Sequence, residues 1–464
     1  MDYGWLSLVP PLLAILLAFL TREPVLSLAV ACLAGVLLMG QGLLGFPELL
    51  ARSLGNRDFM WVCLVEICIG ILVAFYQRCG SVHMFSQRVL SLTKSRIQTQ
   101  LMAWGLGMFI FFSDYFSPLF VGPVMRNLTD RARVSREKLA YICDSTSAPV
   151  SVLAPITGWA VYITGLLIGI GPILDRHDAM ALFIKSIPFN FYGILSIIMV
   201  AFVAAKIIPE YGPMKKAERR AVERGESLRP GSVPMMSSEL TNLPVSVKGN
   251  PNIWLNFFMP VMIVITVNMV SFFATGQARV LASFMLATAV LGATMFIQRV
   301  DNLNGLMQSI QAGIKGVLPA VLILSFAYAI NFVSRDMGTA QYVVESTQGW
   351  FNPALLPLLA FVLSAFISFA TGTSWGTFAI VFPVAVPLAF EFSQGQVTTL
   401  VMGTVAAAAG GGVFGDHCSP LSDTTVLSSL GAACDHMDHV RTQIPYALVV
   451  AALASVIYVF VGLI

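Results

Sequence analysis

The residues best suited to chemistry form a polar run inside an apolar segment near the end of the chain. The run, 415–425, reads Gly-Asp-His-Cys-Ser-Pro-Leu-Ser-Asp-Thr-Thr. Its candidate cation ligands are Asp416, Ser419, Ser422, Asp423 and Thr424. Hard cations such as Na⁺ take carboxylate, hydroxyl and carbonyl oxygens, and Pro420 frees a carbonyl from its helical donor. We therefore predict a Na⁺ site here; the alternative is a hydrogen-bonded break that only bends the helix.

Three more polar clusters interrupt apolar segments. They combine hydroxyls with carboxylates, and their candidate ligands are Ser113, Asp114, Asp144, Ser147, Thr371, Thr373 and Ser374. We expect one cation site in each half of the chain. Asp114, Asp144 and Ser147 would form the first site, and Thr373 and Ser374 would complete the second around the 415–425 run. Na⁺ itself is expected at Asp144, Asp416 and Asp423. The alternative for the first half is that its two acids act as structural caps.

Two further titratable residues lie within apolar surroundings. Glu66 stands in the middle of an apolar run, and a carboxylate at membrane depth is costly and usually functional. It is either a proton carrier or a polar partner on a helix interface. His417 adjoins Asp416, and histidine titrates near neutral pH. It is either a second proton carrier or a hydrogen-bonded structural imidazole.

The sequence contains no motif that supports an enzyme in the context that the motif requires. The segment 372–376 fits the G-x-S-x-G pattern of hydrolases, but that motif needs a strand before it and a helix after it. No phosphate-binding loop is present, which disfavours an ATP-driven pump. Seven cysteines contain no CxxC pair, so neither a zinc site nor a disulfide framework is expected. We predict a transporter without a cofactor, for which Na⁺ and H⁺ are the transported or coupling ions.

The composition places all these residues in a membrane. Of 464 residues, 57% are hydrophobic and only 11% are charged, against about 25% charged in soluble domains. Such a chain cannot cover a soluble surface of this size. A net charge of +3 also gives no reason to expect a nucleic-acid partner. The lipid bilayer is therefore the expected environment, and the chain is predicted to be an all-α polytopic membrane protein.

Apolar segments of about 20 residues predict the spans. Single spans are expected at 5–20, 25–46, 60–76, 179–206, 253–275, 280–298, 316–333 and 443–464. Interrupted segments predict re-entrant hairpins at 101–125 and 353–390, and broken helices at 139–172 and 397–430. Irregular backbone at membrane depth is tolerated only where it is buried or lines a cavity. The four interruptions therefore indicate where ions bind.

Basic residues predict the orientation. Of the 27 lysines and arginines, 21 fall on one side of the predicted topology, which we take as cytoplasmic. The polar, basic segment 209–251 is then a cytoplasmic linker, and both chain ends lie outside. The two flanking segments, 1–208 and 252–464, each contain three spans, a hairpin, a broken helix and a final span. They are predicted to form an inverted-topology repeat, which is typical of secondary transporters.

Three segments together resemble the NhaC family of Na⁺/H⁺ antiporters. They are 415–425, the tip 372–376, and 138–149 with the sequence Lys-Leu-Ala-Tyr-Ile-Cys-Asp-Ser-Thr-Ser-Ala-Pro. The resemblance implies a homodimer whose hairpins and broken helices move with bound ion across a static scaffold. Relatives often carry two adjacent acids where this chain has Ser113 and Asp114, which leaves the Na⁺ to H⁺ stoichiometry open.

Two functions remain in competition. The leading hypothesis is a sodium-coupled secondary transporter of the bacterial inner membrane that exchanges Na⁺ for H⁺ by alternating access, because both cations compete for the same carboxylates. The alternative keeps Na⁺ at these sites and adds a small organic solute, an amino acid or a carboxylate, as symported or exchanged substrate. The sequence does not separate the two. An ion channel is disfavoured, because hairpin tips entering from opposite sides would block a continuous pore.

Overall fold

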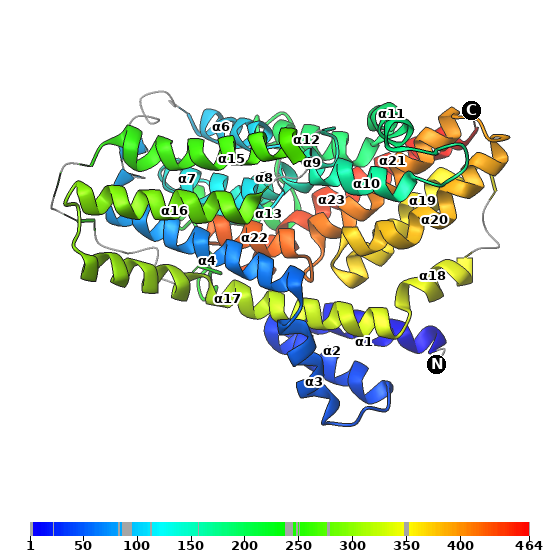
Figure 1. The fold of residues 1–464 in the computed structure, drawn as a ribbon, viewed down its shortest axis with the longest axis horizontal. Coiled ribbons are helices and arrows are strands. Elements are labelled where there is room, and N and C mark those ends of the chain that lie inside the picture. The colour runs from blue at the N-terminus through cyan, green and yellow to red at the C-terminus, as the bar shows by residue number, and fades with distance from the viewer. Residues whose placement is uncertain are drawn as a thin grey trace.

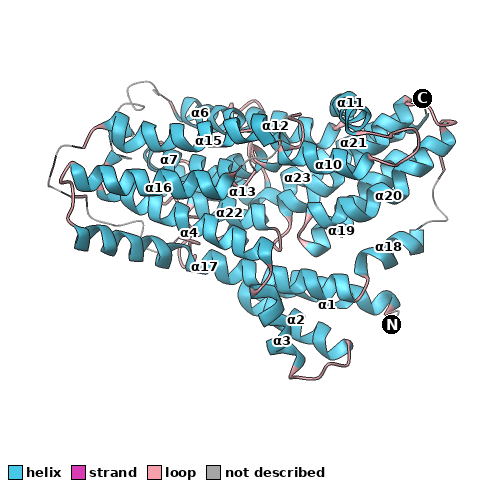
Figure 2. Cartoon of the chain, viewed as in Figure 1, coloured by secondary structure: helices cyan, strands magenta, loops and turns pink. Residues whose placement is uncertain are grey.

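The computed structural model describes residues 3–21, 23–81, 84–85, 95–111, 114–155, 157–236, 245–246, 249, 251–275, 279–347 and 352–463. The described residues form helices and no strand, as the cartoon shows (Figure 2). Within these described ranges, seven helices are long and apolar enough to cross a membrane, or eight if one bent pair counts as a span. The prediction of an all-α polytopic membrane protein is confirmed at this level.

The first helix group is built from the first part of each half of the sequence. Its helices are α1 (Val9–Thr21, after the 3₁₀ turn Gly4–Leu8), α2 (Pro24–Leu38), α3 (Gly45–Leu54), α4 (Arg57–Arg78), α15 (Met259–Thr275, after the π-helical turn Trp254–Phe258), α16 (Val280–Ile297) and α17 (Leu303–Asp336). Helix α17 contacts α2, α3 and α4, and α16 contacts both α4 and α15. Helices α16, α4 and α17 lie side by side, and α1, α2 and α3 lie at the bottom of the view (Figure 1).

The second helix group contains the segments with interrupted apolar character. Its first-half helices are α6 (Arg96–Phe109), α7 (Phe116–Arg131), α8 (Arg136–Ser145), α9 (Ala148–Ser151), α10 (Gly158–Leu167), α11 (Arg176–Ser186) and α12 (Phe191–Ala204), followed by α13 (Gly212–Arg224). Its second-half helices are α19 (Leu356–Thr371), α20 (Ser374–Phe392), α21 (Thr399–Cys418), α22 (Asp423–Ala432) and α23 (His436–Leu463). Helix α18 (Thr339–Thr347) contacts both groups.

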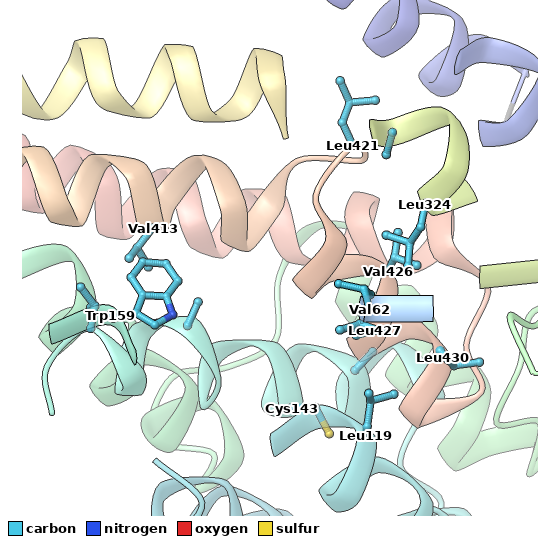
Figure 3. Close-up of a cluster of buried hydrophobic side chains, with 14 of the residues drawn as sticks. Val62, Leu119, Cys143, Trp159, Leu324, Val413, Leu421, Val426, Leu427 and Leu430 are labelled. Carbon is cyan, nitrogen blue, oxygen red and sulfur yellow. The ribbon is translucent and has the colours of Figure 1, made fainter. Parts of the chain in front are cut away.

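Helix α22 is the element on which the two groups meet. It contacts α7, α8 and α23 of the second group and α17 of the first. Its buried Val426, Leu427 and Leu430 lie among apolar side chains that include Leu119 of α7 and Leu324 of α17 (Figure 3). The polar break that precedes α22 is therefore held at the boundary between the groups by ordinary apolar packing.

Four span predictions need correction. The span predicted at 25–46 is α2, which ends at Leu38 before a turn, and the span predicted at 316–333 is part of the longer α17, which begins at Leu303. The segment predicted as one span at 179–206 is two helices, Arg176–Phe189 and Phe191–Ala204, that meet at 46°. Pro188 lacks the amide proton that a continuous helix needs, and the Asn190 side chain instead accepts a hydrogen bond from the amide of Gly193 at the start of α12. The last span was predicted to begin at residue 443, whereas α23 begins at His436.

Helices α7 and α22 approach so closely that a glycine is required at their crossing. A Cβ atom added to Gly122 would lie 2.3 Å from the carbonyl carbon of Gly431. We expect Gly122→Ala to lower the melting temperature of the detergent-solubilised protein, because overpacking costs about 1–3 kcal/mol. Gly105→Ala on α6 is the matched control, since its Cβ would meet nothing within 4 Å. Equal melting temperatures for the two variants would contradict this account of the crossing.

Candidate cation site

Asp416 is the centre of the site that the structure assembles in the second half. Its carboxylate accepts hydrogen bonds from three hydroxyls: Ser374 at 2.9 Å, Ser422 at 2.5 Å and Thr424 at 3.3 Å. Its backbone carbonyl accepts a fourth from Thr425 at 2.8 Å. The side chain is 2% exposed. Hydroxyls from the start of α20 and from both sides of the α22 start thus converge on one buried carboxylate.

Close packing of the α19–α20 turn onto the break brings these groups together. Gly372 ends α19 with φ +72°, and a Cβ there would lie 2.5 Å from the carbonyl oxygen of Leu421. The Ser419 hydroxyl donates to the carbonyl of Phe369 at 2.7 Å, so the break is also hydrogen-bonded to the last turn of α19. Helix α21 ends at Cys418, so its terminal carbonyls face the break. The negative end of a helix favours a cation.

The turn between α6 and α7 supplies a second carboxylate from the first half. Asp114 is 5% exposed and accepts a hydrogen bond from the indole nitrogen of Trp159 at 2.9 Å. The neighbouring Tyr115 donates its hydroxyl to Asp423 at 2.8 Å. Ser113, predicted as a ligand at the same turn, lies outside the described residues. The first-half turn therefore contacts the second-half break directly, through Tyr115 and Asp423.

Four carboxyl groups share this region without a cationic partner. Asp416 interacts electrostatically with Asp423 and Asp114, and Glu66 interacts with Asp423. Within the described part of the chain, no lysine or arginine forms an ion pair with any of them. Ionised carboxylates that lie near one another in a poorly solvated region repel one another. Bound cations or protons are needed to balance them.

Asp144 belongs to a separate polar network. Its carboxylate is fully buried and accepts hydrogen bonds from Ser428 at 3.1 Å and from the amide nitrogen of Gln443 at 2.8 Å. His439 lies 3.7 Å away. The sequence predicted that Asp114 and Asp144 would share a site, but Asp114 lies beside Asp423 instead. The reason is that the first-half turn packs against α22 of the other half, which no local pattern encodes.

His417 connects the two regions. The ring nitrogens of His417 form hydrogen bonds with Ser145 and Tyr192, both at 2.9 Å, and its backbone carbonyl accepts a hydrogen bond from Gln443. His417 therefore follows Asp416 directly in the chain, and Gln443 donates both to its backbone carbonyl and to Asp144. The imidazole is buried and both of its nitrogens have partners.

Glu66 on α4 differs from the other acids. It is fully buried, and among the described residues neither of its carboxyl oxygens has a hydrogen-bond partner. Trp61, one turn earlier on α4, packs edge-on against Tyr115 with ring centroids 5.7 Å apart. Glu66 lies on the first helix group and interacts electrostatically with Asp423 of the second.

Three other predicted residues have local roles in this conformation. Thr371 donates to the carbonyl of Ile367 within α19, and Thr373 accepts from the amide of Gly376 at the start of α20. Ser147 accepts from the amide of Ala148 at 2.6 Å in the break between α8 and α9. None of the three forms a hydrogen bond with a site carboxylate among the described residues.

Sequence reasoning missed several members of the site. Trp159, Ser428, Gln443 and His439 contact its acids, yet each stands alone in an apolar or loop-like segment. His436 and His439 lie before the span predicted at 443–464, yet they are 2% and 0% exposed. One signal was available in the sequence. Gln443 follows His439 by four residues, so the two polar side chains would lie on the same face of a helix.

A cavity of about 570 Å³ reaches the α19–α20 turn from the side of α17 and α18. Its polar lining residues include Asn331, Ser334, Arg335, Thr371, Thr373 and Thr377. The Ser334 hydroxyl is buried and has no hydrogen-bond partner among the described residues. The cavity therefore offers space and polar groups next to the cation site.

Comparison with known proteins assigns the family. A model of the Na⁺/H⁺ antiporter family matches residues 150–463, which include the break, the α19–α20 turn and the Asp144 partners Ser428 and Gln443. The chain belongs to the Na⁺/H⁺ antiporter family. The resemblance seen in the sequence is confirmed, and the protein is a secondary active transporter rather than an enzyme. Na⁺ and H⁺ are the ions transported in this family.

Individual relatives differ in how much they cover. An uncharacterised protein of Haemophilus influenzae is 34% identical over 98% of this chain and 90% of its own length. The malate-2H⁺/Na⁺-lactate antiporter of Bacillus subtilis is 31% identical over 34% of this chain and 32% of its own. An uncharacterised Na⁺/H⁺ antiporter of Haemophilus influenzae is 30% identical over 34% and 33%, respectively.

Proposed function

We propose that this antiporter exchanges Na⁺ for H⁺ at the acid cluster of Asp114, Asp416 and Asp423. The observation that carries the proposal is the convergence of Ser374, Ser422 and Thr424 on the buried Asp416 carboxylate. These hydroxyl and carboxylate oxygens are the ligands that a hard cation prefers. Without Na⁺, protons balance the same acids, so each ion displaces the other.

Asp144 is the proposed carboxylate of a second cation site. Ser428 would add a hydroxyl oxygen to it, and Gln443 would orient it through the hydrogen bond that it already donates. His417 shares Gln443 with this network and follows Asp416 in the chain, so it can relay a change at one acid to the other. The hydroxyls of Ser147, Thr371 and Thr373 are also proposed as cation ligands. They would exchange their present local hydrogen bonds for contacts with the ion when it binds.

Glu66 is the proposed proton carrier. An ionised carboxylate buried without partners costs several kcal/mol, so the neutral acid is the form that suits its surroundings here. It interacts electrostatically with Asp423 across the boundary between the helix groups. A proton exchanged between Glu66 and Asp423 would link protonation to the relative position of the groups.

Alternating access is proposed to occur by movement of the second helix group, which holds both tips and both breaks, against the first. The cation site lies at their boundary, where such movement would change its exposure. Each half carries the same order of elements, a helix pair followed by a broken helix, at α6–α10 and again at α19–α22. This order supports an inverted repeat of 1–208 and 252–464, and a homodimer built on the first group.

The orientation is likewise a proposal. The two chain ends lie at the same end of the molecule (Figure 1), as an inverted repeat with both ends outside requires. The linker 209–251 would face the cytoplasm, since its described helix α13 carries Lys215, Lys216, Arg219, Arg220 and Arg224. The membrane is then the bacterial inner membrane.

The cavity at the α19–α20 turn favours a second candidate function. Its volume of about 570 Å³ is far larger than a Na⁺ ion needs and suits a small organic solute. Arg335 on its wall could pair with a carboxylate, and the Bacillus subtilis relative is named for malate and lactate. Of the two turns, the cavity is lined only by the α19–α20 turn among the described residues.

Competition between Na⁺ and H⁺ is tested by Na⁺ titration of the purified protein at several pH values. Trp159, which donates to Asp114, and Trp375, next to Ser374, are built-in fluorescence reporters. We expect the apparent Na⁺ affinity to rise with pH, by up to about tenfold per pH unit where one proton leaves for each Na⁺ bound. A Na⁺ affinity that is independent of pH would contradict exchange at shared carboxylates.

A further inference from the structure

A basic cavity shares no lining residue with the Asp416 cluster. Its volume is about 820 Å³, and it lies between the end of α1, helix α13 and the start of α23. Phe19 of the first helix group lines one wall. Pro445 of α23 and Lys216 of α13, both in the second group, line others. A ligand in this cavity would therefore touch both groups.

The charges of the cavity favour an anion. Six basic residues line it against three acids, a surplus of three positive charges. Each acid already has an arginine partner: Glu223 pairs with Arg219 at 2.8 Å, Glu137 with Arg220 at 2.9 Å and Asp438 with Arg229 at 2.8 Å. The three remaining basic residues are Lys216, Arg224 and Arg441.

Two of these three cations have no partner in the described part of the chain. Lys216 and Arg224 are exposed on α13, and neither forms an ion pair or hydrogen bond there. Arg441 donates to the carbonyl of Phe19, and its guanidinium lies 6.0 Å from the Phe19 ring centroid. Cationic groups beside aromatic and proline side chains offer both a polar and an apolar contact.

The placement of α13 identifies the source of the anion. Met214, Ala217 and Ala221 are buried against the second group, while four basic residues of α13 remain exposed: Lys215, Lys216, Arg219 and Arg224. The cavity lies where α1 and α23, two apolar helices of candidate spans, end or begin. Basic pockets between spans on the cytoplasmic side suit anionic lipid headgroups. We propose that this cavity binds the phosphate of an acidic phospholipid, with Lys216 and Arg224 as its cationic ligands.

The consequence concerns movement between the helix groups. A headgroup held by α13 and in contact with Phe19 would favour the relative position of the groups seen here. The inference does not depend on the exchange mechanism, because binding can be measured without transport. A failure of Na⁺/H⁺ exchange would leave it intact, and its own failure would leave exchange intact.

The test is a titration of the detergent-purified full chain with dioctanoyl phosphatidylglycerol or dioctanoyl phosphatidylcholine, followed by native mass spectrometry and thermal unfolding. We expect the acidic lipid to bind more tightly. The double variant Lys216→Ala, Arg224→Ala should lose about 25-fold in affinity, since each basic residue near an acidic headgroup contributes about fivefold. The control double variant Lys215→Ala, Arg131→Ala removes two exposed charges outside the cavity and should bind normally.

Three results would overturn the proposal. The two lipids could bind equally, or the two double variants could lose affinity equally, which would indicate a non-specific charge effect. Inorganic phosphate or pyrophosphate could also stabilise the lipid-free protein with the same dependence on Lys216 and Arg224 while the acidic lipid adds nothing. That last result would assign the cavity to a soluble phosphate compound instead.

Discussion

Asp416→Asn is expected to abolish Na⁺-driven proton movement in proteoliposomes while the protein still folds and inserts. Asparagine keeps the shape of aspartate. Its one amide oxygen can accept from either Ser374 or Ser422 and its amide nitrogen can donate to the other hydroxyl, but it carries no charge to balance a cation. Removing one charged partner from a buried ion pair costs about 3–5 kcal/mol, which is more than about 100-fold in affinity. Asp416 accepts three hydroxyls, and no other acid of the cluster has such a ligand set among the described residues.

The matched control is Asp178→Asn, which removes one carboxylate from an exposed position on α11. It should transport normally. The melting temperature of Asp416→Asn in detergent checks the fold, and it should stay close to that of the unaltered protein or rise, because a buried charge is removed. Transport by Asp416→Asn at the normal Na⁺ dependence would exclude Asp416 from the site.

Glu66→Gln is expected to have the second largest effect, through proton coupling. Glutamine fills the same volume but cannot release a proton, so Na⁺ should still bind while proton flux driven by a Na⁺ gradient falls at least about tenfold, or about 1.4 kcal/mol. The readouts are Na⁺ affinity by tryptophan fluorescence and proton flux by a luminal pH dye. The carboxyl oxygens of Glu66 have no hydrogen-bond partner among the described residues, so the substitution breaks no hydrogen bond there and removes only the proton that the acid could release.

Glu48→Gln provides the comparison for this variant, since Glu48 is an exposed glutamate on α3 of the same helix group. It should leave both Na⁺ binding and proton flux unchanged. Normal proton flux in Glu66→Gln would show that Glu66 carries no proton for exchange. A parallel loss of Na⁺ binding would place Glu66 in the cation site itself rather than in the proton path.

Much of the molecule could be predicted from the sequence because a membrane simplifies the rules. Helices are the favoured way to satisfy backbone groups in lipid, so apolar length predicts elements. The acids Asp416 and Asp423 were recognisable because lipid makes such residues costly without a function. The close spacing of Asp416, Ser422 and Thr424 in one break also meant that local backbone geometry alone could bring them together.

Contacts between distant segments could not be predicted in this way. The Tyr115–Asp423 hydrogen bond depends on how α7 and α22 cross, where Gly122 packs against Gly431. The Trp159–Asp114 hydrogen bond depends on where α10 lies relative to the α6–α7 turn. His439 was misjudged for a related reason. Its hydrophilic surroundings resembled a loop, but α23 begins at His436 and packs against α8 and α22, so His439 is buried beside Asp144.

The central claim is that Na⁺ and H⁺ are exchanged without an organic substrate. Its most direct test is the luminal pH of proteoliposomes that contain the full chain, after an outward or inward Na⁺ gradient is imposed in buffer free of amino acids and carboxylates. We predict that a Na⁺ gradient alone changes luminal pH, with the sign reversing when the gradient is reversed, and that Asp416→Asn shows no response. A luminal pH that ignores Na⁺ until malate, lactate or an amino acid is added would contradict the account and establish a solute-coupled transporter.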